Sequence, residues 1–229
     1  MSILFLCLSS SLLVIAFGID SRGDQSLPPL SPEDRLVFSE DFEAQRSLER
    51  FSQAEPDLGH KAGSPETAAW RVLDGKLHAQ EVHNAALWMK TALPEGDVRV
   101  SFVATALTEE GDVKCEFLGD GIHHQSGYIL INGGWKNTVR AIARQDEHGE
   151  DRHDDYRCQR TPRKKCIPAN KPQVWVIERR GQRIDWYIDG VFTLSYRDHN
   201  FINGRYFGFN NWSAHTQFDD LKVYKLASR

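Results

Sequence analysis

The residues best suited to chemistry in this chain are two tryptophans with asparagines beside them. Trp135 lies in an Asn-Gly-Gly-Trp-Lys-Asn segment, and Trp212 directly follows two asparagines. An indole face can stack on the C–H groups of a sugar ring, and neighbouring amides can bond its hydroxyl groups. Both tryptophans fall in loop-like contexts, where packing is a weaker explanation, although a core or anchoring role is the alternative. We predict a sugar site that includes Trp135, Trp212, Asn132, Asn210 and Asn211.

A second set of polar residues lies on one predicted strand, residues 183–188. Trp186 alternates with two isoleucines, which predicts that it points into the core. The opposite face would then carry Arg183, Asp185 and Tyr187. If that face is concave, these residues join Arg140, Asn132, His123 and His124 around one groove. The alternative is an ordinary polar outer face.

Proton transfer is the chemistry expected if the protein is an enzyme. His123 or His124 would act as the base, together with Asp185 or Glu116. Two adjacent histidines on a strand would point apart, so a turn is favoured for this pair. The chain lacks both the tight Glu-x-Asp-x-Glu cluster of glucanases and a Gly-x-Ser-x-Gly elbow.

Aspartates near the two ends of the predicted domain raise the expectation of a structural Ca²⁺ ion. Asp41 follows the first predicted strand, and Asp219 and Asp220 lie in the last one. Carboxylate oxygens are hard ligands that suit Ca²⁺. Solvation of turns and strand ends is the alternative.

The N-terminal residues indicate export. An apolar run at residues 3–17 matches the core of a signal peptide, and we place the signal at residues 1–18. No Lys or Arg precedes the run, so an uncleaved membrane anchor is the alternative. In an exported protein, Cys158 and Cys166 are expected to form a disulfide rather than stay as free thiols, and Cys115 to be a buried hydrophobe. We therefore expect a secreted or extracytoplasmic protein.

Composition narrows the class of partner. The 229 residues carry a formal net charge of -4, with a pI of about 6.1. This balance gives no electrostatic reason to expect nucleic acid as a partner, or a membrane beyond the export signal. Oligosaccharides or polysaccharides remain the expected partners.

Short alternating strands dominate the rest of the chain. Asp189-Gly190 separates two alternating runs and predicts a tight hairpin turn. About a dozen such runs predict an all-β fold of two packed antiparallel sheets. We expect a flexible linker at residues 19–35, one domain at 36–229, and a long charged loop at 144–171.

The order of these segments resembles the concanavalin A-like lectin/glucanase jelly roll. The resemblance rests on Ala-Leu-Trp-Met-Lys, Gly-Tyr-Ile-Leu-Ile, Arg-Ile-Asp-Trp-Tyr-Ile-Asp-Gly, Gly-Phe-Asn-Asn-Trp and Phe-Asp-Asp-Leu-Lys-Val-Tyr. Within that group, the chain is most similar to the 3-keto-disaccharide hydrolase-type domains. The resemblance implies a carbohydrate-binding sandwich or, as the alternative, a related glycoside hydrolase or lyase. An envelope or surface module that docks a protein through its charged loop is the second alternative.

Overall fold

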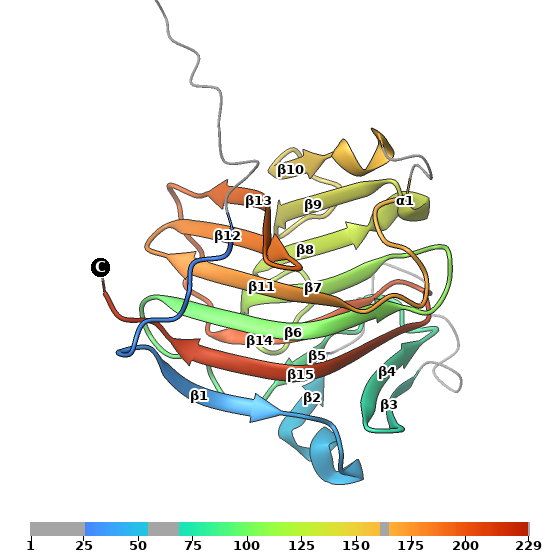
Figure 1. The fold of residues 1–229 in the computed structure, drawn as a ribbon, viewed down its shortest axis with the longest axis horizontal. Coiled ribbons are helices and arrows are strands. Elements are labelled where there is room, and N and C mark those ends of the chain that lie inside the picture. Colours follow the sequence, from blue (N-terminus) through green and yellow to red (C-terminus); the bar gives the residue numbers. More distant parts are fainter. Residues whose placement is uncertain (1–25, 55–68, 161–164, 229) are drawn as a thin grey trace, which may run out of the picture.

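The alternating runs form two antiparallel β-sheets that pack face to face (Figure 1). The structure is a computed structural model that describes residues 26–54, 69–160 and 165–228. The predicted all-β sandwich is confirmed. Among the described residues, no helix is both long and apolar enough to cross a membrane.

Sheet A contains eight strands and sheet B seven. The spatial order of sheet A is β13 (Val191–Arg197), β12 (Arg183–Ile188), β11 (Gln173–Arg180), β6 (Val98–Ala106), β15 (Thr216–Lys225), β4 (Lys76–Gln80) and β3 (Ala69–Leu73), and β1 (Arg35–Glu40) also pairs with β15. The order of sheet B is β10 (Arg152–Asp155), β9 (Val139–Arg144), β8 (Tyr128–Gly133), β7 (Val113–Gly119), β14 (Tyr206–Asn211), β5 (Leu87–Met89) and β2 (Phe51–Gln53). The described residues also form three short helical turns, η2 (Gln45–Arg50), α1 (Gly134–Asn137) and η3 (Arg157–Arg160).

The core lies between the sheets and is rich in aromatic rings. Phe102 of β6 is 1% exposed, and it contacts rings from both sheets. These are Trp175, Phe207, Phe209 and Phe218, with centroids 5.3 to 6.1 Å away. Trp186 is fully buried, as its alternation with two isoleucines predicts. Period-two burial therefore sets which face of each strand enters the core.

The hairpin of β12 and β13 confirms the turn prediction. Asp189 and Gly190 have φ angles of 52° and 78°, the left-handed pair that a tight hairpin turn needs. The turn fixes the register, in which Ile188 pairs with Val191.

The N-terminal end of the described chain packs on the outer face of sheet A. Leu27 N donates to Gly190 O at 2.8 Å, and Arg99 donates to Pro28 O at 2.6 Å. Asp34 Oδ1 accepts from Ala227 N at 2.7 Å. Residues 26–34 therefore differ from the expected flexible linker, because their backbone groups find partners on the sheet. The predicted signal and residues 19–25 lie outside the described residues.

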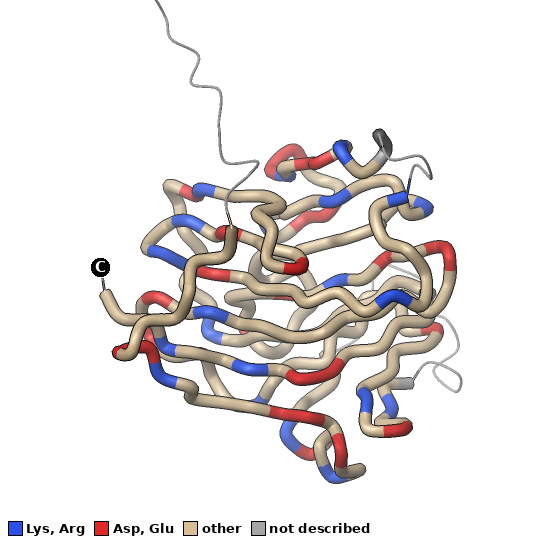
Figure 2. Tube along the Cα trace, in the orientation of Figure 1, with Lys and Arg blue, Asp and Glu red and all other residues tan. Residues whose placement is uncertain are grey.

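The charged segment 144–171 contains more structure than the expected solvated loop. It includes β10, η3 and a disulfide between Cys158 and Cys166, which confirms the predicted pairing. Its charges neutralise each other locally, as in the Arg152–Asp154 pair at 2.6 Å. Figure 2 shows positive and negative residues scattered over the fold rather than gathered on one sheet. Residues 161–164 lie outside the description.

Candidate functional site

A cavity of about 790 Å³ adjoins the outer face of sheet B, at the end of β7 where Lys114 lies. Five connecting segments surround it: β4–β5, β6–β7, α1, β9–β10 and β14–β15. Its lining includes Asn84, Asp112, Lys114, Trp135, Glu147 and Trp212. The volume of the cavity and its mixture of polar and aromatic lining residues suit a small polar ligand with apolar faces.

Trp135 lies in a strained turn that other groups hold in place. Trp135, Lys136 and Asn137 have φ angles of 50°, 61° and 65°, so three consecutive non-glycine residues are left-handed. Each such residue costs about 1–2 kcal/mol. The guanidinium of Arg152 stacks over the indole at 4.4 Å, and it donates to the backbone of Glu147 at 2.7 Å. The ring is therefore fixed while 39% of the residue stays exposed.

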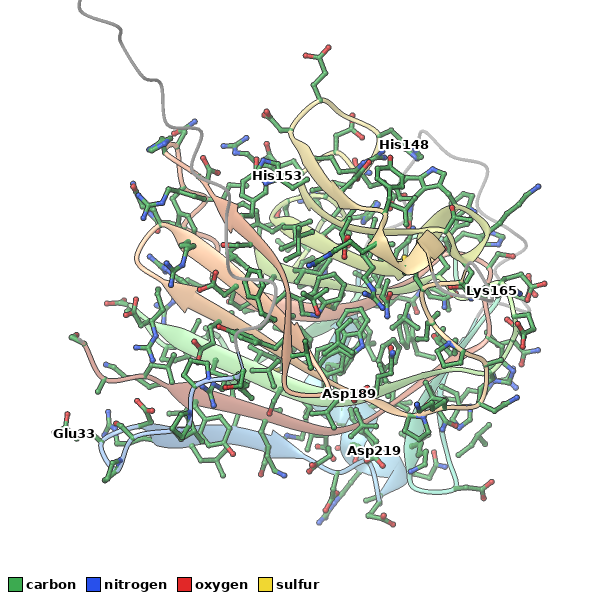
Figure 3. The ribbon with its side chains drawn as sticks, turned by 45° about the horizontal axis from the view of Figure 1, so that its top comes forward. Glu33, His148, His153, Lys165, Asp189 and Asp219 are labelled. Atoms are coloured by element: carbon green, nitrogen blue, oxygen red, sulfur yellow. A yellow bond between two sulfur atoms is a disulfide. The ribbon has the colours of Figure 1, made fainter. Side chains whose placement is uncertain are left out.

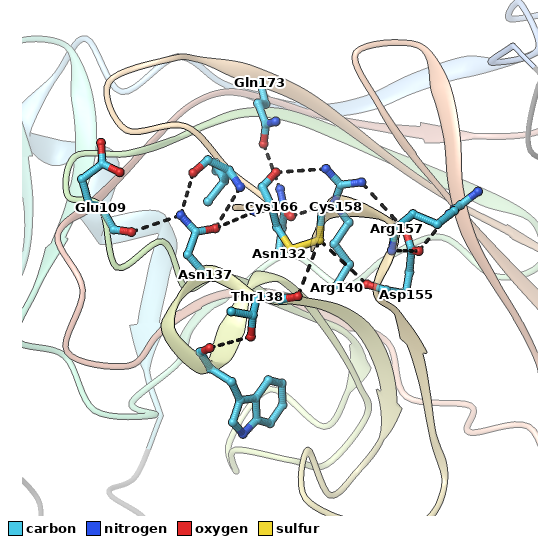
Figure 4. Close-up of a disulfide and its surroundings, with 12 residues drawn as sticks. Glu109, Asn132, Asn137, Thr138, Arg140, Asp155, Arg157, Cys158, Cys166 and Gln173 are labelled. Atoms are coloured by element: carbon cyan, nitrogen blue, oxygen red, sulfur yellow. Dashed lines mark hydrogen bonds and ion pairs between the residues drawn. A yellow bond between two sulfur atoms is a disulfide. The ribbon is translucent and has the colours of Figure 1, made fainter. Parts of the chain in front are cut away.

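Hydrogen bonds of Asn137 offset this strain (Figure 4). Its Oδ1 accepts from the backbone N of Cys166 and of Ile167, at 3.0 and 2.9 Å. Its Nδ2 donates to the carbonyl oxygens of Glu109 and Ile167, at 3.1 and 2.7 Å. The disulfide segment and the β6–β7 loop thus support the turn that presents Trp135.

Trp212 reaches the same cavity from the β14–β15 loop. It forms a bridge with His83, whose ring lies 5.1 Å from the indole. Backbone bonds on either side, from Asn84 N to Asn211 O and from Ser213 N to Val82 O, are both 2.9 Å. Trp212 is also 39% exposed, so the structure brings the two predicted tryptophans to one site.

A buried ion pair lies in the wall between the loops. Lys114 Nζ is 2.8 Å from Glu147 Oε2, and each side chain is 5% exposed. Asn84 Nδ2 donates to Glu147 Oε1 at 3.4 Å, while Asn84 Oδ1 is buried and has no partner among the described residues. Burial opposes ionisation of Glu147, but Lys114 outweighs it and lowers the pKa of this carboxyl.

Asp112 is the least satisfied carboxylate of the cavity. Its closest cation among the described residues is Lys114, whose Nζ lies 3.7 Å from Oδ2, beyond hydrogen-bond distance. Its side chain is only 14% exposed. Burial therefore raises the pKa of Asp112 to about 6, with Lys114 opposing the rise and Glu147 adding to it.

Asp112→Asn is expected to stabilise the protein at pH 7. The folded state holds the Asp112 proton more tightly than the unfolded chain, whose carboxyl titrates near 3.8, so Asp112 weakens folding as pH rises from about 4 to about 6. Removing the charge should raise the free energy of unfolding by up to about 3 kcal/mol at pH 7, and by little below pH 4. Urea unfolding at both pH values measures this difference. An equal gain at both would show that the charge is not the cause.

Glu116 and His124, two proposed catalytic residues, meet beside the cavity but are enclosed. His124 Nδ1 lies 2.6 Å from Glu116 Oε1, and the two side chains are 2% and 0% exposed. Glu116 also accepts from Asn210 Nδ2 and from the backbone N of Gln125, both at 3.0 Å. His123 lies apart in the β7–β8 turn, 62% exposed and 2.7 Å from Asp120. The favoured turn for this histidine pair is confirmed.

Three predicted ligand residues, Asn132, Arg140 and Asn211, lie between the sheets instead of in the cavity. Asn132 donates to Gln173 at 2.9 Å and accepts from Arg140 at 2.9 Å. Asn211 donates to Thr216 at 2.9 Å. Their side chains bond one sheet to the other or to nearby loops, because each follows the inward phase of its strand.

The single groove expected around Arg183, Asp185 and Tyr187 is not present. These residues lie on the outer face of sheet A, whereas His124 and the cavity lie on the outer face of sheet B. Asp185 bonds Arg183 at 2.8 Å and Ser195 at 2.7 Å. The prediction that Arg183, Asp185 and Tyr187 point out of the core is therefore correct. The prediction that they share a groove with His124 is wrong, because they belong to sheet A.

The aspartates proposed for Ca²⁺ have other contacts. Asp219 pairs with Lys76 and Asp220 with Lys222, both at 2.7 Å. Asp41 accepts from the backbone N of Glu43 at 3.3 Å. In Figure 3, Asp219 lies in the lower part of the molecule, whereas His148, which lines the cavity, lies near the top. The described residues contain no group of three or more such side chains placed to hold a metal, and the Ca²⁺ prediction stays untested.

The cavity residues that sequence patterns missed include the four of its polar wall: Asn84, Asp112, Lys114 and Glu147. Glu147 is one of several acidic residues in the charged segment 144–171. Asn84 lies in a loop that carries no recognisable motif. Lys114 lies in the outward phase of β7, and this alternation is the signal that could have found it.

Comparison with solved structures identifies the fold. No family model matches the chain, and no curated protein matches it. The carbohydrate-binding module CBM66 from Bacillus subtilis matches with a TM-score of 0.55 and 14% identity, over 77% of this chain and 96% of the module. An endo-β-1,3-glucanase from Pyrococcus furiosus matches with a TM-score of 0.59 and 12% identity, over 86% and 96% of the two chains. A laminarinase from Flavobacterium sp. UMI-01 gives 0.57 and 12%, over 83% and 100%.

The chain therefore has the concanavalin A-like lectin/glucanase jelly-roll fold, as the segment order predicted. At these identities the matches define the fold alone. The finer resemblance to 3-keto-disaccharide hydrolase-type domains stays a prediction.

Proposed function

We propose that this protein binds carbohydrate in the cavity beside sheet B. The observation that carries the proposal is that Trp135 and Trp212, which come from different loops and are each 39% exposed, line the same cavity. Two accessible indoles in one concave site offer apolar faces for sugar rings. An isolated exposed tryptophan would need no such explanation.

Fixed geometry supports a binding role. Arg152 stacks on Trp135, and the loop of Trp212 is tied to the β4–β5 loop by backbone bonds. A ligand then meets rings that are already ordered, which lowers the entropy cost of binding. The surrounding amide and carboxylate groups of Asn84, Asp112 and Glu147 supply partners for hydroxyl groups.

The similar structures agree with this function. One is called a carbohydrate-binding module and two are named as glucanase or laminarinase. Recognition of an oligosaccharide or polysaccharide outside the cytoplasm is what we propose for this chain. The disulfide Cys158–Cys166 supports an oxidising compartment, and the apolar N-terminal run supports export.

Hydrolysis is less well supported than binding. The rival mechanism used His124 with Glu116, but both side chains are almost fully enclosed and neither lines the cavity. A catalytic pair must lie within hydrogen-bond distance of its substrate. A mixed panel of glycans incubated with the protein would reveal turnover by the appearance of shorter products.

Trp135→Ala and Trp212→Ala are expected to weaken glycan binding about 30-fold each. Loss of a buried aromatic contact at a binding site costs about 2 kcal/mol. A glycan array with the wild-type protein selects the ligand, and calorimetric titration measures the variants.

Tyr156→Ala is the matched control, because Tyr156 is 49% exposed and does not line the cavity. This variant should bind like the wild type. Unchanged affinity in both tryptophan variants, or no glycan bound by the wild type, would contradict the proposal.

A further inference from the structure

The polar wall of the cavity has more acceptors than donors. Asn84 is 4% exposed, and its Oδ1 is buried with no hydrogen-bond partner among the described residues. Asp112 has Lys114 no closer than 3.7 Å. Lys114 gives its short contact to Glu147, at 2.8 Å, and Glu147 in turn accepts from Asn84. These four residues form one chain of contacts along the wall.

Unpaired acceptors beside a cavity favour a ligand with several donors. The ionised carboxylate of Asp112, which lines the cavity and is partly exposed, accepts only. A sugar hydroxyl offers one donor, whereas a protonated amine offers three and a full positive charge. Hydrogen bonds between ionised groups are also about twice as strong as neutral ones.

The charge balance of the cavity points the same way. Lys114 and Glu147 neutralise each other as a buried pair. The other carboxylates that line the cavity are Glu81, Glu110 and Asp112, against one further lysine, Lys136. The remaining field is negative, so it attracts a cation and repels carboxylated or sulfated sugars.

We propose that the cavity prefers amino sugars with a free, protonated amine, which the carboxylate of Asp112 binds. This inference rests on the proposed carbohydrate-binding function and names its ligand class. The tryptophans hold the apolar face of the ring, while the amine faces the acceptor wall.

A pH signature should accompany this preference. The groups that line the cavity with Asp112 come from its own loop, from β7, from α1 and from the β4–β5, β9–β10 and β14–β15 connections. They are Glu81, Glu110, Lys114, Lys136, Glu147, His148 and His215. Asp112 loses its charge as pH falls through about 6. The preference for the amine should weaken over that interval.

Three β-1,4-linked tetraoses test the inference, because they differ only in the group at carbon 2. They are cellotetraose with a hydroxyl, the N-acetylglucosamine tetramer with an amide, and the glucosamine tetramer with an amine. Calorimetric titration of the whole protein at pH 7 should show the glucosamine tetramer bound at least about tenfold more tightly than cellotetraose. The ratio should fall toward one in Asp112→Asn and, for the wild type, at pH 5.

Glu109→Gln is the matched control, because Glu109 is exposed, pairs with Lys165 and does not line the cavity. It should keep the preference. Since Asp112→Asn is expected to fold more stably than the wild type, misfolding would not explain its loss of selectivity.

The possible failures are distinct. Equal binding of the three tetraoses, or no binding of the glucosamine tetramer while other glycans on the array bind, overturns the amino-sugar inference and leaves the proposed function intact. No binding to any glycan overturns both. A preference that persists in Asp112→Asn also overturns the inference.

Discussion

Replacing Asn137 with alanine is expected to lower the free energy of unfolding by about 3 kcal/mol, because its side chain makes four hydrogen bonds to the backbone of Glu109, Cys166 and Ile167, three of them buried. Alanine also tolerates the left-handed conformation of this position, φ 65°, less well than asparagine. Glycan affinity should fall at least about tenfold, since the turn that fixes Trp135 loses its support. Chemical denaturation and calorimetric titration measure the two effects.

Asn170→Ala separates backbone strain from the hydrogen bonds. Asn170 has a similar φ of 58° but is exposed. Its substitution carries the conformational cost alone and should change stability by about 1 kcal/mol. If Asn137→Ala is no more damaging than this control, the hydrogen bonds of Asn137 do not hold the turn.

Glu116→Ala is expected to be the second severe change, with a loss of about 3–4 kcal/mol in the free energy of unfolding. The carboxylate is 0% exposed and accepts from His124, Asn210 and the backbone of Gln125, so its removal takes a hydrogen-bond partner from three groups at once. The effect should appear in thermal and urea unfolding. Where the variant remains folded, its affinity for glycans should stay within a few-fold of the wild type, since Glu116 does not line the cavity.

Glu109→Ala is the comparison for this prediction. Its carboxylate pairs with Lys165 at the surface, where ion pairs contribute about 0–1 kcal/mol. A small stability loss in Glu116→Ala, combined with the loss of a measured turnover, would instead restore the enzymatic hypothesis for Glu116 and His124.

Sequence alternation was sufficient to predict most strands. In β6 the inward residues Val98, Val100, Phe102 and Ala104 are buried, as strand alternation requires. The Asp189-Gly190 turn was predicted from residue type alone, since few residues adopt two consecutive positive φ angles readily. The disulfide followed from spacing and the expected compartment.

The same alternation could not assign faces to sheets. It indicates that Asp185 points out of the core, but not which outer face of the sandwich it joins, and Glu116 lies on the opposite face. A period of two specifies inside or outside for each strand, whereas strand order specifies which outer face it joins. The predicted single groove failed for that reason.

The sequence by itself determined the all-β class, the phase of each strand and the two indoles suited to a sugar, because these depend on local residue type and spacing. Only the tertiary structure decided that Trp135 and Trp212 share a cavity, and that Asn84, Asp112, Lys114 and Glu147 form its wall. Those contacts join residues far apart in the chain, and they depend on how the loops pack over sheet B. Local propensities carry no information about such packing.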